Sequence, residues 1–292
     1  MAFNPQIWSA KTINAMERAM KTRKAVIATI TDYTKFTEGT QAEAYNGPII
    51  GSSSIATLPA SSGDVNSPTN TFLNLPFDQK KGVIFNISDI DNAQTNVNLL
   101  NEYTADAGDT LLDDYDLEVV KTIIGGLTTD ATQRKVLTDS SNLVITEADF
   151  IKAKAYLNSI NAPQRGRTCL ISPVHESQLY TISNFISRDK ISNTEAVPEG
   201  VIGRLHGFDV LLYNAMPKVN KSGKIDTTAG SNTKNCTLFY QSLVCAFARQ
   251  KAIGTKVADN ALLPGATVNI YSVYGRKIQK GAYGYLVYDN AS

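Results

Sequence analysis

The sequence contains few residues whose chemistry and spacing could support catalysis. His175 and His206 are its only histidines, and Cys169 lies six residues before His175. A cysteine close to a histidine can form a nucleophile with its general base. No third group to orient the histidine, and no oxyanion site, can be predicted around this pair. We therefore interpret Cys169 and His175 as structural residues.

The glycines of residues 200–207 could indicate a phosphate-binding loop. Gly200, Gly203 and Gly207 lack the Gly-x-Gly spacing through which a backbone approaches a pyrophosphate. The segment instead predicts two strands joined by a tight turn, over residues 200–213. The sequence also has no Walker motif, no Cys-x-x-Cys pair, no His-Glu-x-x-His motif and no interleaved basic and aromatic residues. We predict no catalytic, cofactor-binding or metal-binding residue, so the protein is expected to act through its shape and not as an enzyme.

Carboxylates form the most regular pattern in the chain. Nine acidic residues and no Lys or Arg lie between Lys81 and Lys121. Five of them recur at helical spacing and form what we call the acidic stripe: Glu102, Asp106, Asp109, Asp113 and Asp116. A metal site is disfavoured, because no histidine is near and the spacing is not that of a calcium loop. Two interpretations stay open, a solvated face or a surface that binds a basic partner.

The N-terminal region has the opposite charge. Residues 1–35 contain six basic residues against Glu17 and Asp32, a local net charge of +4. A tryptophan this close to the terminus is typical of an anchor against a neighbouring surface. The candidates for a subunit interface are therefore the acidic stripe and five N-terminal residues: Trp8, Arg18, Lys21, Arg23 and Lys24.

A long helix must position the acidic stripe. Apolar residues recur every three or four positions from about Asp91 to Ile124, and Gly125–Gly126 would end the helix. The predicted apolar face consists of Ala93, Val97, Leu100, Tyr103, Ala107, Leu111, Tyr115, Val119 and Ile123. At about 1.5 Å per residue this helix would be about 50 Å long, which favours a strut in a large assembly. A short apolar run before it, Val83–Ile87, predicts a buried strand.

The region before this strand has a different character. Ala25–Ile30 is rich in β-prone residues, and residues 34–82 are interrupted repeatedly by Pro, Gly and Ser. Loops of this length are uncommon in compact domains unless they have a function. Residues 34–82 therefore predict an extended β-hairpin that reaches away from the body, with its tip near Ser61–Asn66.

The region after the long helix predicts a mixed α and β body. A second helix is expected from about Thr146, and Arg167–Pro173 predicts a strand that stops at its proline. Lys218–Asn235 is polar and rich in Gly and Ser, which predicts a surface loop that tolerates insertions near Gly223. Ala266–Ile278 and Gly281–Tyr288 predict a long C-terminal β-hairpin.

Composition limits the class of protein. The 292 residues can bury a substantial core, and 28 basic against 27 acidic residues leave no global charge that argues for nucleic acid. The three cysteines lie in apolar runs and are interpreted as buried free thiols in a reducing compartment. No apolar run approaches the roughly 20 residues of a membrane span.

The order of these parts resembles the major capsid proteins of tailed bacteriophages, with the α+β fold known as the Hong Kong 97 type. The most specific stretches are Phe77–Lys81 leading into Phe85–Gln94, and Val197–Val210. The resemblance implies the following division: an N-terminal arm at 1–33, an E-loop at 34–82, a peripheral domain at 83–145 and 264–290 with its spine helix at 91–124, and an axial domain at 146–263.

The same resemblance implies a function and partners. The protein would assemble as hexamers and pentamers into an icosahedral head that encloses double-stranded DNA, in the host cytoplasm, with no membrane. A portal protein, a possible cement protein and non-specific contact with the packaged DNA are expected. Because only about 30 residues precede the E-loop, the resemblance implies a separate scaffolding protein or a segment already removed, and Met1 favours the former. Two alternatives stay open, an encapsulin-like bacterial compartment and an α+β hydrolase that uses Cys169 or the acidic stripe.

Overall fold

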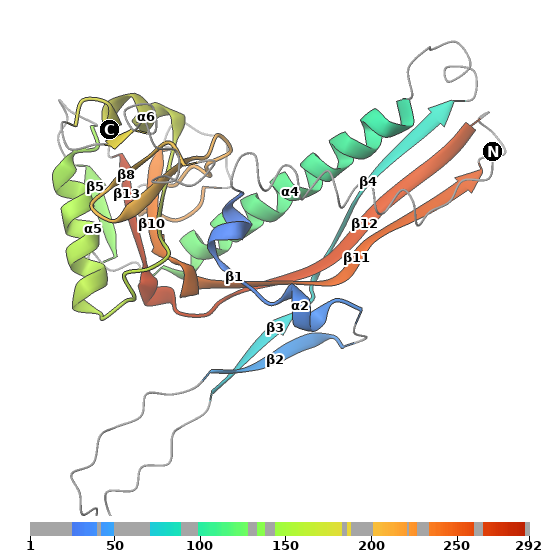
Figure 1. Ribbon diagram of the computed structural model, residues 1–292, viewed down its shortest axis with the longest axis horizontal. Coiled ribbons are helices and arrows are strands. Elements are labelled where there is room, and N and C mark those ends of the chain that lie inside the picture. The colour runs from blue at the N-terminus through green and yellow to red at the C-terminus, as the bar shows by residue number, and fades with distance from the viewer. Residues whose placement is uncertain are drawn as a thin grey trace, which may run out of the picture.

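The protein combines two sheets, one long helix and a projecting hairpin (Figure 1). The computed structural model describes residues 25–39, 42–49, 71–88, 99–127, 133–137, 144–182, 186–187, 201–220, 222–226, 234–259 and 265–289. One end of the molecule holds a seven-stranded sheet with helices beside it. A four-stranded sheet with the long helix along one face extends from it, so the overall class is a mixed α and β fold.

The four-stranded sheet is built on two long antiparallel strands, β11 and β12, in the order β1-β11-β12-β4. Its strands are β1 Thr31–Asp32, β4 Gln79–Ser88, β11 Cys245–Asp259 and β12 Gly265–Ile278. Along β4, Val83 and Phe85 pack against the core whereas Ile84 is 66% exposed. The prediction of a buried strand at 83–87 is therefore wrong. The strand is half-buried, because the long helix covers only one face of the sheet.

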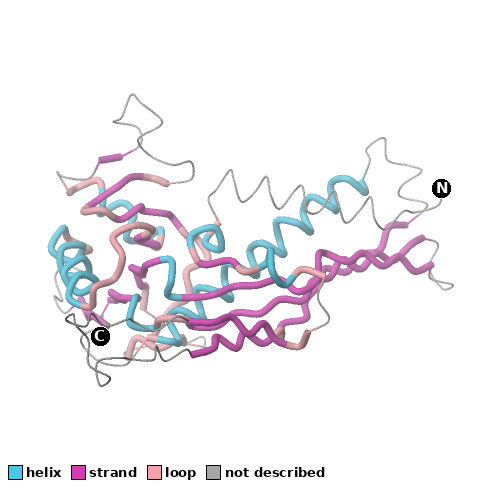
Figure 2. Tube along the Cα trace, turned by 60° about the horizontal axis from the view of Figure 1, so that its bottom comes forward, coloured by secondary structure: helices cyan, strands magenta, loops and turns pink. Residues whose placement is uncertain are grey.

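The long helix, α4, spans Leu99–Gly126 and lies along this sheet (Figures 1 and 2). Its apolar face from Ala107 to Ile123 is buried as predicted, and Tyr103 is exposed. Its end at the glycine pair is also as predicted, and the expected start at 91–98 lies outside the described residues. A Cβ at Gly126 would collide with Ile278, so the helix end requires a glycine there. Among the helices that the structure describes, none has the length and apolar character to cross a membrane.

The seven-stranded sheet has the order β5-β13-β10-β6-β9-β8-β7. Its strands are β5 Arg134–Leu137, β6 Arg167–Ile171, β7 Ile186–Ser187, β8 Gly203–Leu205, β9 Phe208–Leu212, β10 Cys236–Gln241 and β13 Gly284–Asp289. Helix α5, Glu147–Ser159, begins where it is predicted to begin, and a capping box between Thr146 and Asp149 stabilises its start. A hydrophobic core lies between α5 and the seven-stranded sheet. It centres on three aromatic rings that meet edge to face: Phe150, Phe208 and Phe239.

The glycine-rich segment at 200–213 forms the predicted pair of strands. His206 and Gly207 have positive φ angles of 49° and 89° and make the tight turn between β8 and β9. This backbone conformation is readily adopted by Gly and costs other residues energy. The segment is therefore a β-turn and not a phosphate-binding loop.

The C-terminal strands do not pair with one another. β12 belongs to the four-stranded sheet and β13 to the seven-stranded sheet, so the predicted hairpin is wrong. The short helix η5, Gly281–Tyr283, redirects the chain from one sheet to the other. The helix η4, Ser242–Val244, does the same between β10 and β11, and the backbone N–H of Gln279 donates to Val244 O at 3.0 Å where the crossings meet.

The segment that follows residue 24 belongs to the body of the molecule. Ala25, Val26 and Ile27 are buried, and Val26–Thr29 forms the 3₁₀ helix η1 in place of the β structure expected at 25–30. Residues 31–32 then pair in parallel with β11. The helix α2, Thr34–Thr37, packs against β11 beside them.

The strands β2, Ala44–Ile49, and β3, Thr71–Pro76, form an antiparallel hairpin that projects from the body (Figure 1). This agrees with the prediction of an extended hairpin, although the predicted tip lies outside the described residues. Its base is anchored by Leu75, which packs with Phe77 and Ala248 on the face of the four-stranded sheet turned away from α4.

The predicted tolerant loop at 218–235 is partly structural. Val219 is buried and forms bridges with Ile225 and Lys234. Gly223 is also buried, with φ of 69°, and its carbonyl accepts a hydrogen bond from Arg134. The prediction of insertion tolerance near Gly223 is therefore not supported. Gly223 is held in place by a contact with Arg134 of β5, which is far away in the sequence, so local composition cannot reveal it.

Candidate subunit-interaction surfaces

The acidic stripe lies on the face of α4 opposite the sheet, and its residues differ in exposure. Asp106, Asp109 and Asp113 are exposed to solvent. Glu102 lies in α4, but its side chain is outside the described part. Asp116 is only 2% exposed, so the prediction that the whole stripe is a surface is wrong at this residue.

The segment η1 covers Asp116. The backbone N–H of Ile27 donates to Asp116 Oδ1 at 2.9 Å, a hydrogen bond that satisfies a buried carboxylate. One turn further, the hydroxyls of Thr29 and Tyr240 share a hydrogen bond of 2.5 Å. The segment thus contacts α4 on one side and β10 of the seven-stranded sheet on the other. The basic N-terminal residues and the acidic stripe were both predicted as interface candidates. Within the described residues, the N-terminal segment contacts the stripe through this backbone hydrogen bond.

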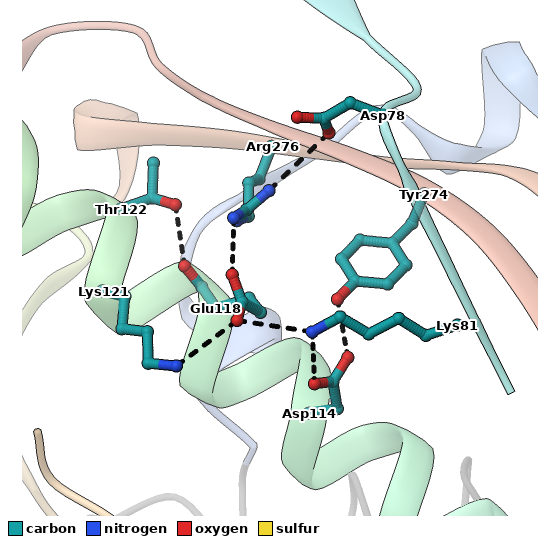
Figure 3. A network of polar contacts seen from close by, with 8 residues as sticks. All are labelled: Asp78, Lys81, Asp114, Glu118, Lys121, Thr122, Tyr274 and Arg276. Atoms are coloured by element: carbon teal, nitrogen blue, oxygen red, sulfur yellow. Dashed lines mark hydrogen bonds and ion pairs between the residues drawn. The ribbon is translucent and has the colours of Figure 1, made fainter. Parts of the chain in front are cut away.

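Two further carboxylates of α4 bind the sheet (Figure 3). Lys81 Nζ, from β4, lies 2.6 Å from Asp114 Oδ1 and 3.3 Å from Glu118 Oε1. Arg276 Nη2, from β12, lies 2.5 Å from Glu118 Oε2, and Lys121 adds a contact of 3.4 Å. The acidic run between Lys81 and Lys121 is therefore partly neutralised by bases that come from neighbouring strands.

This network sets the ionisation of its members. Burial alone would raise the pKa of Glu118, but Arg276, Lys81 and Lys121 outweigh it and hold that pKa below its usual value. The Tyr274 hydroxyl donates to Asp114 Oδ2 at 2.6 Å. Burial and the neighbouring Asp114 raise the pKa of Tyr274, so its hydroxyl stays a proton donor. The sequence analysis missed Tyr274 and Arg276, because only the strand register brings them to the helix.

A cavity of about 550 Å³ opens where η1, α4 and β9 meet. Its lining combines carboxylates with apolar side chains: Ala25, Asp113, Asp116, Leu117, Leu211 and Tyr213. Arg23 and Lys24 directly precede Ala25 in the sequence. The arm candidates Trp8, Arg18, Lys21, Arg23 and Lys24 themselves lie outside the described residues.

The possible catalytic pair has structural surroundings. Cys169 is fully buried in β6, and burial raises the pKa of its thiol well above the usual value, which disfavours the reactive thiolate. His175 is also fully buried, in the helix α6, Pro173–Leu179. Its Nδ1 lies 3.0 Å from Thr237 Oγ1 and its Nε2 lies 2.9 Å from Asp289 Oδ1, so the ring joins α6 to β10 and β13. No cluster of metal-binding side chains occurs among the residues described here.

The fold of this chain is similar to that of chains in several solved capsid and virus-like particle structures. The capsid chain of the cyanophage P-SCSP1u matches with a TM-score of 0.65 and 18% identity, over 90% of this chain and 87% of that one. The capsid of Ralstonia phage GP4 matches with a TM-score of 0.66 and 12% identity, over 94% and 91%. A virus-like particle from Pyrococcus furiosus matches with a TM-score of 0.57 and 10% identity, over 97% and 98%.

The sequence carries the family assignment. A family model described as phage capsid protein matches residues 77–276, which include α4, β4, β11 and most of β12. The chain belongs to this phage capsid protein family. No curated protein matches the sequence.

Proposed function

We propose that this chain is the major capsid protein of a tailed phage, and that it assembles as hexamers and pentamers into an icosahedral head. The head encloses double-stranded DNA. The observation that carries the proposal is the phage capsid family match over residues 77–276. The fold shared with phage capsid chains over nine-tenths of the length supports it.

The parts of the chain take distinct roles in this proposal. Residues 1–33 act as an N-terminal arm whose last part, 25–33, packs on its own subunit, and residues 34–82 act as an E-loop. Both segments are proposed to reach neighbouring subunits. Residues 83–145 and 264–290 form the peripheral domain with α4 as its spine, and 146–263 form the axial domain, except that β11 pairs within the four-stranded sheet and β5 and β13 pair within the seven-stranded sheet. The exposed part of the acidic stripe and the basic arm are the proposed subunit-interface elements.

The proposal includes other components of a phage head. A portal protein and a separate scaffolding protein take part in assembly in the host cytoplasm, and a cement protein binds the finished virion capsid. Contact with the packaged duplex is non-specific, in line with the almost neutral net charge of +1. No enzymatic activity is proposed.

A second candidate is a shell that encloses protein, as in an encapsulin-like compartment. It is supported by the match to the Pyrococcus furiosus virus-like particle over 97% of this chain, at a lower TM-score than the two phage capsids named above. The hydrolase alternative has little support, because Cys169 is buried and its pKa is raised.

Electron microscopy of the purified full-length chain tests the proposal. We expect closed shells, tubes or polyheads, because the proposed function requires contacts between copies of this chain. A variant that lacks Ala56–Asn70, in the E-loop, is the matched control and should remain unassembled. A chain that stays monomeric at every concentration, with or without co-expressed phage proteins, would contradict the proposal. Particles filled with protein and free of nucleic acid after assembly in phage-producing cells would favour the second candidate.

A further inference from the structure

The face of the four-stranded sheet turned away from α4 carries a group of lysines. Lys80 on β4 and Lys251 on β11 both pair with Val273 of β12, so they flank it in one row across the sheet. Lys256 pairs with Asn269, four residues along β12 and therefore on the same face. All three lysines are exposed.

The fourth corner of this face and the position between the lysines are apolar. Ile84 pairs with Asn269 and is 66% exposed. Tyr271 lies between the two rows, and Lys251 Nζ approaches its hydroxyl to 2.8 Å and its ring centroid to 4.8 Å. The residues paired with Tyr271 in the adjacent strands are Gly82 and Gly254, which have no side chain, and Lys251 reaches the ring from the neighbouring row. We call Lys80, Lys251, Lys256, Ile84 and Tyr271 the lysine face.

The lysine face has no internal counter-charge. In the described parts of β4, β11 and β12, no Asp or Glu lies at a position of this face. Lys81 and Arg276 differ, because they point to the other side of the sheet and pair there with α4. The layer formed by α4 and the sheet is therefore acidic on the helix side, at Asp106 and Asp109, and basic on the sheet side.

We propose that the lysine face binds an acidic segment of a second, different protein on the surface of the shell. Exposed apolar side chains next to charged ones are typical of protein–protein interfaces, which combine an apolar core with a polar rim. A flat strip with one aromatic ring already covered by Lys251 offers no stacking platform for nucleic acid. The acidic stripe cannot supply the counter-charge within one subunit, because it lies on the opposite side of the layer. The location on a shell rests on the proposed function, whereas the binding chemistry does not.

A fluorescent copolymer of glutamate and tyrosine is the probe, titrated with the full-length chain in whatever assembly state it adopts. Replacing Lys80, Lys251 and Lys256 together by Gln should weaken binding about tenfold at low salt. The matched control replaces three exposed lysines elsewhere, Lys152, Lys218 and Lys224, by Gln and should leave binding within about twofold. Thermal melts of both variants verify that each still folds.

A second variant tests the contribution of the apolar side chains separately from that of the charge. Ile84→Ser should weaken binding of the glutamate–tyrosine copolymer by several fold and leave binding of polyglutamate unchanged, because only the copolymer can bury an apolar group. Equal losses in the two triple variants, or no binding to the wild-type chain, would overturn the proposal. Tighter binding of a DNA duplex of equal charge would assign the face to nucleic acid instead. Self-association without probe, abolished by the Lys80 triple variant, would assign it to a second copy.

Failure of this inference and failure of the proposed function are distinguishable. Microscopy of the same samples reports whether shells form, independently of probe binding. A chain that forms no shells but binds the probe through the lysine face would contradict the proposed function alone. Shells of the wild type and shells of the Lys80 triple variant that bind the probe equally would contradict this inference alone.

Discussion

Asp116 of α4 accepts the backbone N–H of Ile27 in a buried hydrogen bond of 2.9 Å. Asp116→Ala removes the acceptor and leaves the buried N–H of Ile27 without this hydrogen bond, which should lower the free energy of unfolding by about 1–3 kcal/mol. Asp116→Asn keeps an acceptor oxygen and should cost less. Asp109→Ala, exposed on the same helix, is the control and should change stability by less than about 0.5 kcal/mol. Urea denaturation of the unassembled chain measures all three, and equal effects at the two sites would contradict the contact.

The acidic stripe is expected to pair with the arm of a neighbouring subunit. Arg23→Glu with Lys24→Glu should impair assembly, and Asp109→Lys with Asp113→Lys should partly restore it. Each exposed pair is worth about 0.2–1 kcal/mol, and repetition over a shell amplifies this, so raised salt should weaken assembly of the wild type. Light scattering during assembly follows the effect.

The control for this charge swap is Lys152→Glu with Lys154→Glu, on α5. These variants introduce the same charge change away from the arm and should assemble normally. A silent swap in the arm, or a helix swap that never restores assembly, would show that arm and stripe do not pair. The exposed aspartates would then form a solvated or DNA-facing surface.

The E-loop is expected to contribute to assembly and little to subunit stability. Deletion of Ala56–Asn70 leaves β2 and β3 in place, together with the packing of Leu75 at the base of the hairpin. The melting temperature of the subunit should therefore change little, whereas the yield of particles should fall sharply. Leu75→Ala is the opposite control, because it empties a buried site and should cost about 2–5 kcal/mol. Normal particle yield after the deletion would contradict the expectation.

The Glu118 network should stabilise the subunit in a pH-dependent manner. Arg276, Lys81 and Lys121 lower the pKa of Glu118 in the folded protein. The stabilising effect of the Glu118 carboxylate is therefore present above its unfolded pKa and is lost as the pH falls through its folded pKa. Glu118→Gln should cost about 1–3 kcal/mol near pH 7, and the difference from wild type should shrink below about pH 4. Denaturation at a series of pH values measures it.

Asp78→Asn is the control for this network. Asp78 is 54% exposed and lies 3.7 Å from Arg276, so its loss should cost less than about 0.5 kcal/mol at every pH. A pH-independent effect of Glu118→Gln would mean that the network contributes through packing and not through charge.

Gly223 should be sensitive to substitution. Its φ is 69°, and a Cβ there would lie 2.9 Å from Tyr288 Cε1 and 3.0 Å from Arg134 Nη1. Gly39 has a similar φ of 80° but open space around it. Gly39→Ala should therefore cost about 1–2 kcal/mol for backbone strain alone, and Gly223→Ala should cost more. Similar losses at the two sites, measured by urea denaturation, would show that the contacts of Gly223 yield easily.

Local sequence patterns predicted the elements well, and long-range pairing set the rest. The apolar period of α4 between Ala107 and Ile123 and the capping box at Thr146 are determined by residues a few positions apart. The split of β12 and β13 between two sheets depends on partners far away in the sequence, so the pattern alone favoured a simple hairpin. The same limit hid Arg276 as the partner of Glu118.

The candidate site shows this limit in a second form. Helical spacing correctly placed Asp106, Asp109, Asp113 and Asp116 on one face of α4, but spacing does not report what covers that face. η1 covers Asp116 and leaves the other three exposed. The lysine face could not be inferred either, because three strands that are separated in the sequence contribute to it.

The two chain crossings at η4 and η5 have a mechanical consequence. The antiparallel ribbon of β11 and β12 continues through them into the antiparallel ribbon of β10 and β13, so one two-stranded ribbon passes through both sheets with a bend between. Tension along the molecule is therefore carried by two covalent backbones in parallel, and the ladder between them resists shear. Rotation at the bend is resisted by one hydrophobic core that joins α4, β10, β12 and β13, so the junction is strong in extension and stiff in bending.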